Sequence, residues 1–259
     1  MHLDENVIRW TAGLCLDIGV AALAVRSGLF KRLPVFTCYL FVVAACDVAS
    51  TLCRVIFPVR SFPVFYEYWG GQAVMMGMRA ASVAEICYRL LGPYRGIWRL
   101  CRIFLVAVAL FLVVSAGFAA GGQQHSMTMF ITLLQRGMEL AIAGTLAFSF
   151  LFAKYYQVKL ERFMALIIGG LMFYSAVQIG NSQFMNQLKG PYFDFYAELS
   201  LAAFSISTLI WLAAVWRPVP ELTPVLEPVE ADAEALGASR QEVNARLREL
   251  NARLSEILR

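Results

Sequence analysis

Long apolar stretches separated by short polar segments dominate the first 216 residues. Seven of them match the length of a membrane-spanning helix, which needs about 20 residues to cross roughly 30 Å of hydrocarbon. Their predicted bounds are 8–27, 35–57, 64–90, 98–119, 127–153, 162–185 and 195–216. A mean hydropathy of +0.64 also exceeds that of soluble domains. The pattern predicts an all-α fold, a polytopic membrane protein with a seven-helix transmembrane bundle over residues 1–216.

Lys and Arg residues gather in every second predicted loop. They follow the first, third and fifth stretches, whereas the intervening loops hold only Arg60 and Lys189. Because cytoplasmic loops carry an excess of Lys and Arg, this alternation predicts an N-terminus outside and a C-terminus in the cytoplasm. We expect an integral protein of a bacterial cytoplasmic (inner) membrane, with the lipid bilayer as a partner.

A different composition begins after the last apolar stretch. Residues 217–238 interleave Pro with Glu, which predicts an extended linker. Residues 239–259 open with a capping-box spacing at Ser239 and Glu242 and then repeat an apolar seven-residue pattern. The residues of this seam are Val243, Leu247, Leu250, Leu254 and Ile257. They predict a short C-terminal cytoplasmic coiled-coil helix that makes a homo-oligomer, with three or four subunits favoured.

The tail has a second interpretation. It could fold back as an amphipathic helix on the cytoplasmic leaflet of the membrane. Its polar face carries Glu as well as Arg, and its apolar face has no Trp or Phe, so the coiled coil is favoured. Glu249 and Arg253 are spaced to form an i, i+4 pair on this helix.

Polar side chains inside the apolar stretches are the candidates for function. Ionisable groups are costly in the bilayer and therefore face the bundle interior or a wet cavity. The candidate pathway or pocket residues are Asp17, Asp47, Arg54, Arg79, Arg136, Glu139, Gln178, Asn181 and Glu198. On the predicted topology they fall in the middle and outer half of the bundle, which predicts a polar crevice open to the outside. The alternative is a set of structural ion pairs that fix the helix register.

Arg79 needs a partner from another helix. It has no acidic residue three or four positions away, and Asp17, Asp47 and Glu139 lie at compatible depths. Arg136 and Glu139 are spaced to pair locally at i, i+3. The sequence therefore predicts a buried network that joins several helices without fixing which acid meets Arg79.

Small residues mark places where helices can approach closely. Ala73, Gly77 and Ala81 form a small-xxx-small stripe suited to helix packing. The pairs Gly70–Gly71 and Gly169–Gly170 are either packing sites or breaks in the helices of an inverted-repeat transporter. We favour packing sites.

Several functions lack their minimal parts. The seventh stretch has no lysine for a retinal Schiff base, and the two histidines, His2 and His125, lie outside the stretches, which argues against haem. The sequence contains no zinc-protease, serine-hydrolase or thiol-redox motif, and it contains no phosphate-binding loop. The short cytoplasmic loops cannot build a nucleic-acid surface. We predict no catalytic residues, metal or cofactor, although an enzyme that acts through an embedded Asp or Glu stays open.

Two functions fit these observations. The first is an oligomeric ion or small-solute channel or transporter, in which the buried charges line or gate a pathway. The second is a receptor-like sensor or membrane scaffold, in which the outward crevice binds a ligand and the coiled coil transmits or recruits. The absence of an attached output domain favours the first, whereas the outward position of the polar groups favours the second.

Overall fold

The computed structural model describes residues 5–58, 61–92, 95–121, 126–155, 160–187 and 192–217, together with 245–250, 253 and 256. Every regular element in these residues is a helix. The helices are α1 (Glu5–Arg26), α2 (Leu29–Arg32), α3 (Pro34–Ile56), α4 (Phe62–Leu91), α5 (Arg95–Ala120), α6 (Ser126–Tyr155), α7 (Arg162–Gln187) and α8 (Tyr192–Val215). Each of the seven predicted stretches coincides with one of the seven long helices.

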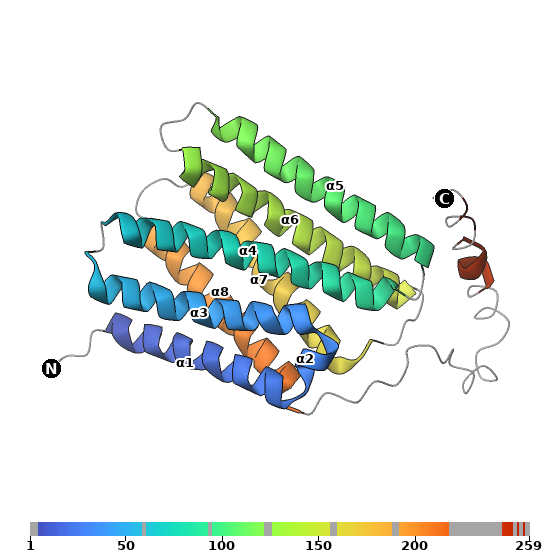
Figure 1. The fold of residues 1–259 in the computed structure, drawn as a ribbon, viewed down its shortest axis with the longest axis horizontal. Coiled ribbons are helices and arrows are strands. Elements are labelled where there is room, and N and C mark those ends of the chain that lie inside the picture. The colour runs from blue at the N-terminus through green and yellow to red at the C-terminus, as the bar shows by residue number, and fades with distance from the viewer. Residues whose placement is uncertain are drawn as a thin grey trace.

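Consecutive long helices run in opposite directions and form one bundle (Figure 1). Six of them close a ring, because α1 contacts α3 and α8, α4 contacts α3 and α6, and α7 contacts α6 and α8. Helix α5 lies outside this ring and packs against α4 and α6. The ring helices can therefore turn side chains toward a common interior, which α5 does not reach.

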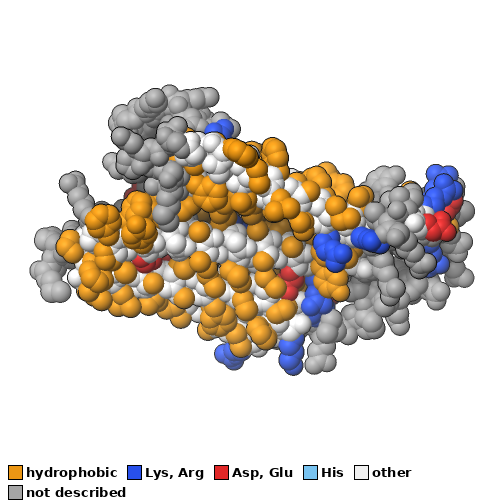
Figure 2. Space-filling model, turned by 45° about the horizontal axis from the view of Figure 1, so that its top comes forward, with side chains coloured by type: hydrophobic (Ala, Val, Ile, Leu, Met, Phe, Trp, Pro, Cys, Tyr) orange, Lys and Arg blue, Asp and Glu red, His pale blue; other side chains and the backbone are white. Residues whose placement is uncertain are grey.

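Charged and apolar side chains lie on different parts of the bundle surface, as is expected for a protein in a membrane. Five described segments are long and apolar enough to span a bilayer: Pro34–Ile56, Gly96–Ala120, Met129–Lys154, Arg162–Ser182 and Glu198–Val215. Hydrophobic side chains cover the visible flank, and Lys and Arg side chains gather toward one end (Figure 2). We name this the basic end; α1, α4, α6 and α8 end there. These features support a membrane protein. Helix α4 and the described part of α1 are not among these five segments.

A short helical turn at the basic end was not predicted from the sequence. Gly28 takes a positive φ of 80° between α1 and α2, a backbone conformation that favours glycine. Pro34 then begins α3. The Glu85 carboxylate on α4 accepts hydrogen bonds from the backbone N–H groups of Val35 and Phe36 at 3.2 and 2.9 Å. Glu85 therefore caps the start of α3, since the first helical N–H groups have no partner within their own helix.

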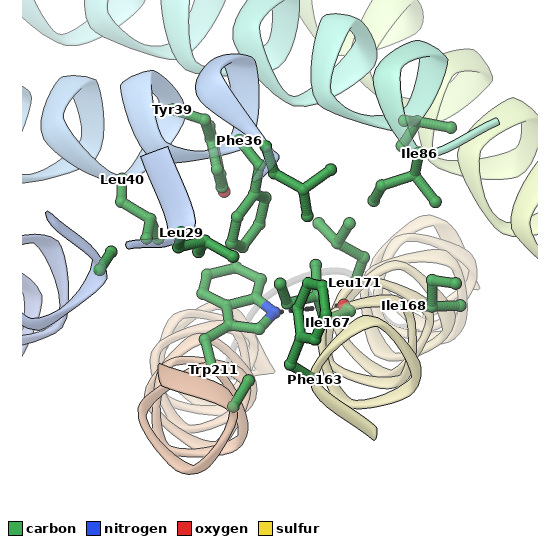
Figure 3. Close-up of a cluster of buried hydrophobic side chains, with 14 of the residues drawn as sticks. Leu29, Phe36, Tyr39, Leu40, Ile86, Phe163, Ile167, Ile168, Leu171 and Trp211 are labelled. Atoms are coloured by element: carbon green, nitrogen blue, oxygen red, sulfur yellow. Dashed lines mark hydrogen bonds between the residues drawn. The ribbon is translucent and has the colours of Figure 1, made fainter. Parts of the chain in front are cut away.

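The half of the bundle toward the basic end is filled by apolar side chains, which we name the apolar plug. Trp211 of α8 lies at its centre and packs edge-on against Phe36 of α3, with ring centroids 5.6 Å apart (Figure 3). Its indole N–H donates to the Ile167 carbonyl oxygen at 3.3 Å. Further buried members are Val20, Ala24, Leu29, Leu33, Leu40, Ile86, Leu90, Ile142, Leu146, Ile168, Leu171 and Ala214. The plug joins helices from opposite sides of the ring.

The paired glycines do not break their helices, because α4 and α7 continue through them, and one glycine of each pair, Gly71 and Gly170, lies against a neighbouring helix. A Cβ atom at Gly170 would lie 2.4 Å from Nε1 of Trp211, which is itself buried. A Cβ atom at the adjacent Gly169 would meet no atom within 4 Å. Gly170 is thus required for the close approach of α7 and α8.

Gly170→Ala is therefore expected to lower the free energy of unfolding by about 1–3 kcal/mol, because the added methyl group displaces a ring held on all sides. Gly169→Ala is the matched control and should change stability far less. Thermal denaturation of both purified variants in detergent measures the difference. Equal stabilities of the two variants would contradict the packing described here.

Candidate functional site

A buried ion pair lies between α4 and α6 in the ring interior. The Arg79 guanidinium donates from Nη2 to Oε1 of Glu139, and both side chains are almost completely buried. Ser175 of α7 donates its hydroxyl to the other Glu139 oxygen at 2.7 Å. The Arg79 guanidinium also lies over the ring of Tyr174, 4.8 Å from its centroid. The predicted interhelical partner of Arg79 is thus Glu139, and three helices share the charges.

Hydrogen bonds continue from this pair along α7 and α8. Gln178 donates to the Tyr174 hydroxyl at 2.9 Å, and Ser200 of α8 donates to the Gln178 carbonyl oxygen at 3.3 Å. Asn181 then donates to the Ser200 hydroxyl oxygen at 2.8 Å. Because α7 ends and α8 begins at the end opposite the basic end, this branch leads away from the apolar plug.

A second branch lies between α1, α3 and α8. The carboxyl groups of Asp17 and Asp47 lie close enough to interact, and Asp17 is buried. Thr208 of α8 donates its hydroxyl to Oδ1 of Asp17 at 3.4 Å. Farther from the basic end, Ser50 of α3 donates to Glu67 of α4 at 2.7 Å. This branch is acidic.

Tyr39, a buried side chain of α3, lies near both branches. It is close enough to Asp17, Arg79 and Glu139 for their charges to act on its hydroxyl group. We name the combined set the polar network: Asp17, Tyr39, Asp47, Arg79, Glu139, Tyr174, Ser175, Gln178, Asn181, Ser200 and Thr208. Each of the six ring helices contributes at least one member, whereas the described part of α5 contributes none.

The network and the plug divide the ring interior between them. The network occupies the middle of the bundle and the half away from the basic end, and the plug fills the other half. The polar side chains of Glu85 and Ser149, which lie near the basic end, make local contacts. Glu85 caps α3, and the Ser149 hydroxyl lies 3.4 Å from the Cys87 thiol. No continuous polar path to the basic end is built from the described residues.

Six of the nine predicted site residues belong to the network, and three do not. Arg54 and Glu198 are exposed, and Arg136 is half-buried. The local i, i+3 pair was wrong, because Glu139 bonds Arg79 and not Arg136. The reason is the direction of the side chains, because Arg79 and Glu139 both face the ring interior.

Two further expectations need correction or addition. The stripe of Ala73, Gly77 and Ala81 is exposed, so it packs against no helix of the same chain. Sequence reasoning also missed members whose side chains are common in membrane helices. They are Tyr39, Tyr174, Ser175, Ser200 and Thr208. Only the spacing of Tyr174, Gln178 and Asn181 by four and three residues could have indicated one of them.

The network holds two features that a bound group would complete. The Arg79 Nε–H is buried and has no acceptor in the described part of the chain, so it is available to a water or solute oxygen. The carboxyl groups of Asp17 and Asp47 are neighbours, and two such groups can hydrogen-bond to each other only when one of them carries a proton, because ionised carboxylates only accept. Among the described residues no group of three His, Cys, Asp or Glu side chains is arranged to hold a metal ion.

Most of the predicted tail lies outside the described residues, including the linker and the seam residues Val243, Leu254 and Ile257. Residues 245–250 are helical, with Leu247 buried and Leu250 exposed. The predicted i, i+4 pair is confirmed, since Arg253 donates to Glu249 at 2.6 Å. The coiled coil itself stays a prediction.

No protein-family model, curated protein or solved structure matches this chain. The functional argument therefore rests on the residues of the network and the plug.

The ion pair gives a direct stability test. Arg79→Leu leaves the Glu139 carboxylate buried without its counter-charge and should lower the free energy of unfolding by about 3–5 kcal/mol. Adding Glu139→Leu to this variant should restore part of the loss, because no uncompensated charge remains. Thermal unfolding of the two single variants and the double variant in detergent measures the coupling.

Arg136→Leu is the matched control. It removes an arginine from α6 that does not pair with Glu139, so its effect should be much smaller than that of Arg79→Leu. If the stability lost in the double variant equals the sum of the losses in the two single variants, Arg79 and Glu139 are not a coupled pair.

Proposed function

We propose that this protein is a membrane transporter for an ion or small polar solute. The observation that carries the proposal is a buried polar network, supplied by six helices, that ends against an apolar plug. A solute entering from the end opposite the basic end would meet the Arg79 donor and the Asp17–Asp47 pair. Two neighbouring carboxyl groups can take up a proton between them, which makes protons the first candidate for the transported or coupled ion.

The plug favours a transporter over an open channel. A channel needs a hydrated or polar path through the whole membrane, whereas here Trp211 and Phe36 close one half of the ring interior. A transporter instead exposes a midplane site to one side at a time. In this proposal the network is the midplane site, and the apolar plug closes it on the side of the basic end.

The membrane topology is part of the proposal. Helices α1 and α4 would complete seven spans, since α1 packs against α3 and α8, and α4 against α3, α5 and α6. In α4 the inward-facing Arg79 lowers the hydropathy without facing lipid. The basic end would lie in the cytoplasm of a bacterial cell, with the N-terminus outside.

In this proposal the tail holds several copies of the chain together as an oligomer. The seam residues would pair between copies of the chain, in three or four strands. A short helix of this length is marginal alone in water, so partner strands would stabilise it.

Deleting residues 239–259 should therefore leave a folded bundle and reduce the oligomer. Native mass spectrometry of the full chain and the truncated chain measures the subunit number. An unchanged subunit number after truncation would remove the coiled coil as the cause of assembly.

A receptor-like sensor is the second candidate. It is favoured by one observation, that the polar groups lie away from the basic end and reach no path across the bundle. In that case the network would bind a ligand and the tail would transmit or recruit. Ligand-dependent thermal stabilisation without any flux would support this function.

Flux into liposomes tests transport directly. We expect the purified protein to carry protons or small ions under a pH or voltage gradient. Asp17→Asn, Asp47→Asn and Glu139→Gln should each reduce the flux at least tenfold, because each removes a charge from the network. Fluorescent pH and potential indicators report the rates.

Glu249→Gln is the control, since this residue is exposed on the tail and lies outside the network. Its flux should equal that of the wild type. Flux that survives all three network substitutions would exclude the network as the pathway.

A further inference from the structure

The seven long helices contain an internal repeat in their packing. Helices α1, α3 and α4 pack in chain order, and so do α6, α7 and α8, with α5 between the two sets. The third helix of each set packs against the first helix of the other, α4 on α6 and α8 on α1. Equivalent helices run in the same direction (Figure 1). We name the sets the first half and the second half.

Buried positions repeat at the same spacing in the two halves. In α1, Asp17, Val20 and Ala24 are buried; in α6, Glu139, Ile142 and Leu146 are buried with the same intervals. In α3 the buried residues Tyr39, Leu40 and Val43 precede Asp47. In α7 the buried residues Ile167, Ile168 and Leu171 precede Ser175 at identical spacing. The repeat therefore extends from helix order to individual residues.

The polar contacts repeat as well. Glu139, on the first helix of its half, contacts Ser175 on the second helix of the same half and Arg79 on the third helix of the other half. Asp17 occupies the same place in the first half. It contacts Asp47 on the second helix of its own half and Thr208 on the third helix of the other. Each acid thus bridges the seam between the halves.

Other contacts cross between the halves at the basic end. Arg32 on α2 pairs with Glu161 before α7 at 3.4 Å, and Trp211 of the second half packs on Phe36 of the first. Across the α4–α6 seam, the Cys87 thiol lies 3.4 Å from the Ser149 hydroxyl. These contacts close the plug, and all of them would have to separate for the plug to open.

We propose that the two halves are quasi-equivalent rigid units, and that the protein opens its apolar plug by moving one half against the other along the α4–α6 and α8–α1 seams. Parallel repeats of this kind give a transporter two access states by the movement of one repeat against the other. Helix α5 serves as the connection that keeps both halves in the same orientation. The inference rests on the proposed transport function and supplies its moving parts.

Two disulfides distinguish a movement between halves from a general restriction of the bundle. Ser149→Cys places a second thiol beside Cys87 and, on oxidation, joins α4 to α6 across the seam at the plug. Cys101→Ser removes the other thiol near Cys87 and serves as the background. With the oxidised bond verified by mass spectrometry, flux in liposomes should fall at least tenfold and return on reduction.

Gly71→Cys in the same background is the matched control within the first half. Its Cβ atom would lie 3.9 Å from the Cβ of Cys46, within the range of about 3.5–4.5 Å found in disulfides. This bond joins α3 to α4 without crossing a seam, so flux should be unchanged. Persisting flux with the seam disulfide, or equal inhibition by both disulfides, would overturn the proposal.

A distance measurement tests the movement even if no flux is found. Spin labels at Phe30 and Trp216 report on opposite halves at the basic end, whereas labels at Phe30 and Tyr88 report on the first half alone; all three positions are exposed. In nanodiscs between acidic and alkaline pH, the first pair should give two populated distances and the second a single one. A single invariant distance for both pairs would overturn the movement, whereas absent flux alone would refute the transport function.

Discussion

The cost of burying charge in an apolar bundle determines the interior of this protein. An isolated charge in such surroundings is unfavourable by several kcal/mol, so each must find a partner or a proton. Arg79 and Glu139 satisfy this requirement for each other from separate helices, and Ser175 and Tyr174 take up further polar atoms. The helices α4, α6 and α7 are therefore linked through one carboxylate, because Glu139 on α6 bonds Arg79 on α4 and Ser175 on α7.

The same requirement is met differently in the first half. Asp17 occupies the position of Glu139, but it contacts Thr208 where Glu139 contacts Arg79, and it has a second acid, Asp47, where Glu139 contacts Ser175. A hydrogen bond between two carboxyl groups holds together through a proton. The two sites therefore differ in charge, because Glu139 has the counter-charge of Arg79 whereas Asp17 has a second acid beside it. Such a difference is what a coupled site requires.

The apolar plug gives the network its direction. Packed side chains of Trp211, Phe36 and their neighbours exclude water from the half toward the basic end. Polar groups in that half, such as Glu85, are occupied in capping and local contacts. The protein thereby combines a closed apolar plug with a hydrogen-bonded polar network. The contacts between the first half and the second half of the chain decide whether the plug stays closed.

Hydrophobic periodicity and loop charge determined the helices, their approximate ends and their alternating direction, because these properties follow from the local chain and its apolar surroundings. Burial cost alone also marked Asp17, Asp47, Arg79 and Glu139 as interior residues. Only the tertiary structure decided that Arg79 forms an ion pair with Glu139, that Tyr39 lies near both branches of the network and that α5 packs outside the ring. Such contacts depend on which helix faces lie together, and common side chains such as Ser175 and Ser200 give no sign of that in the sequence.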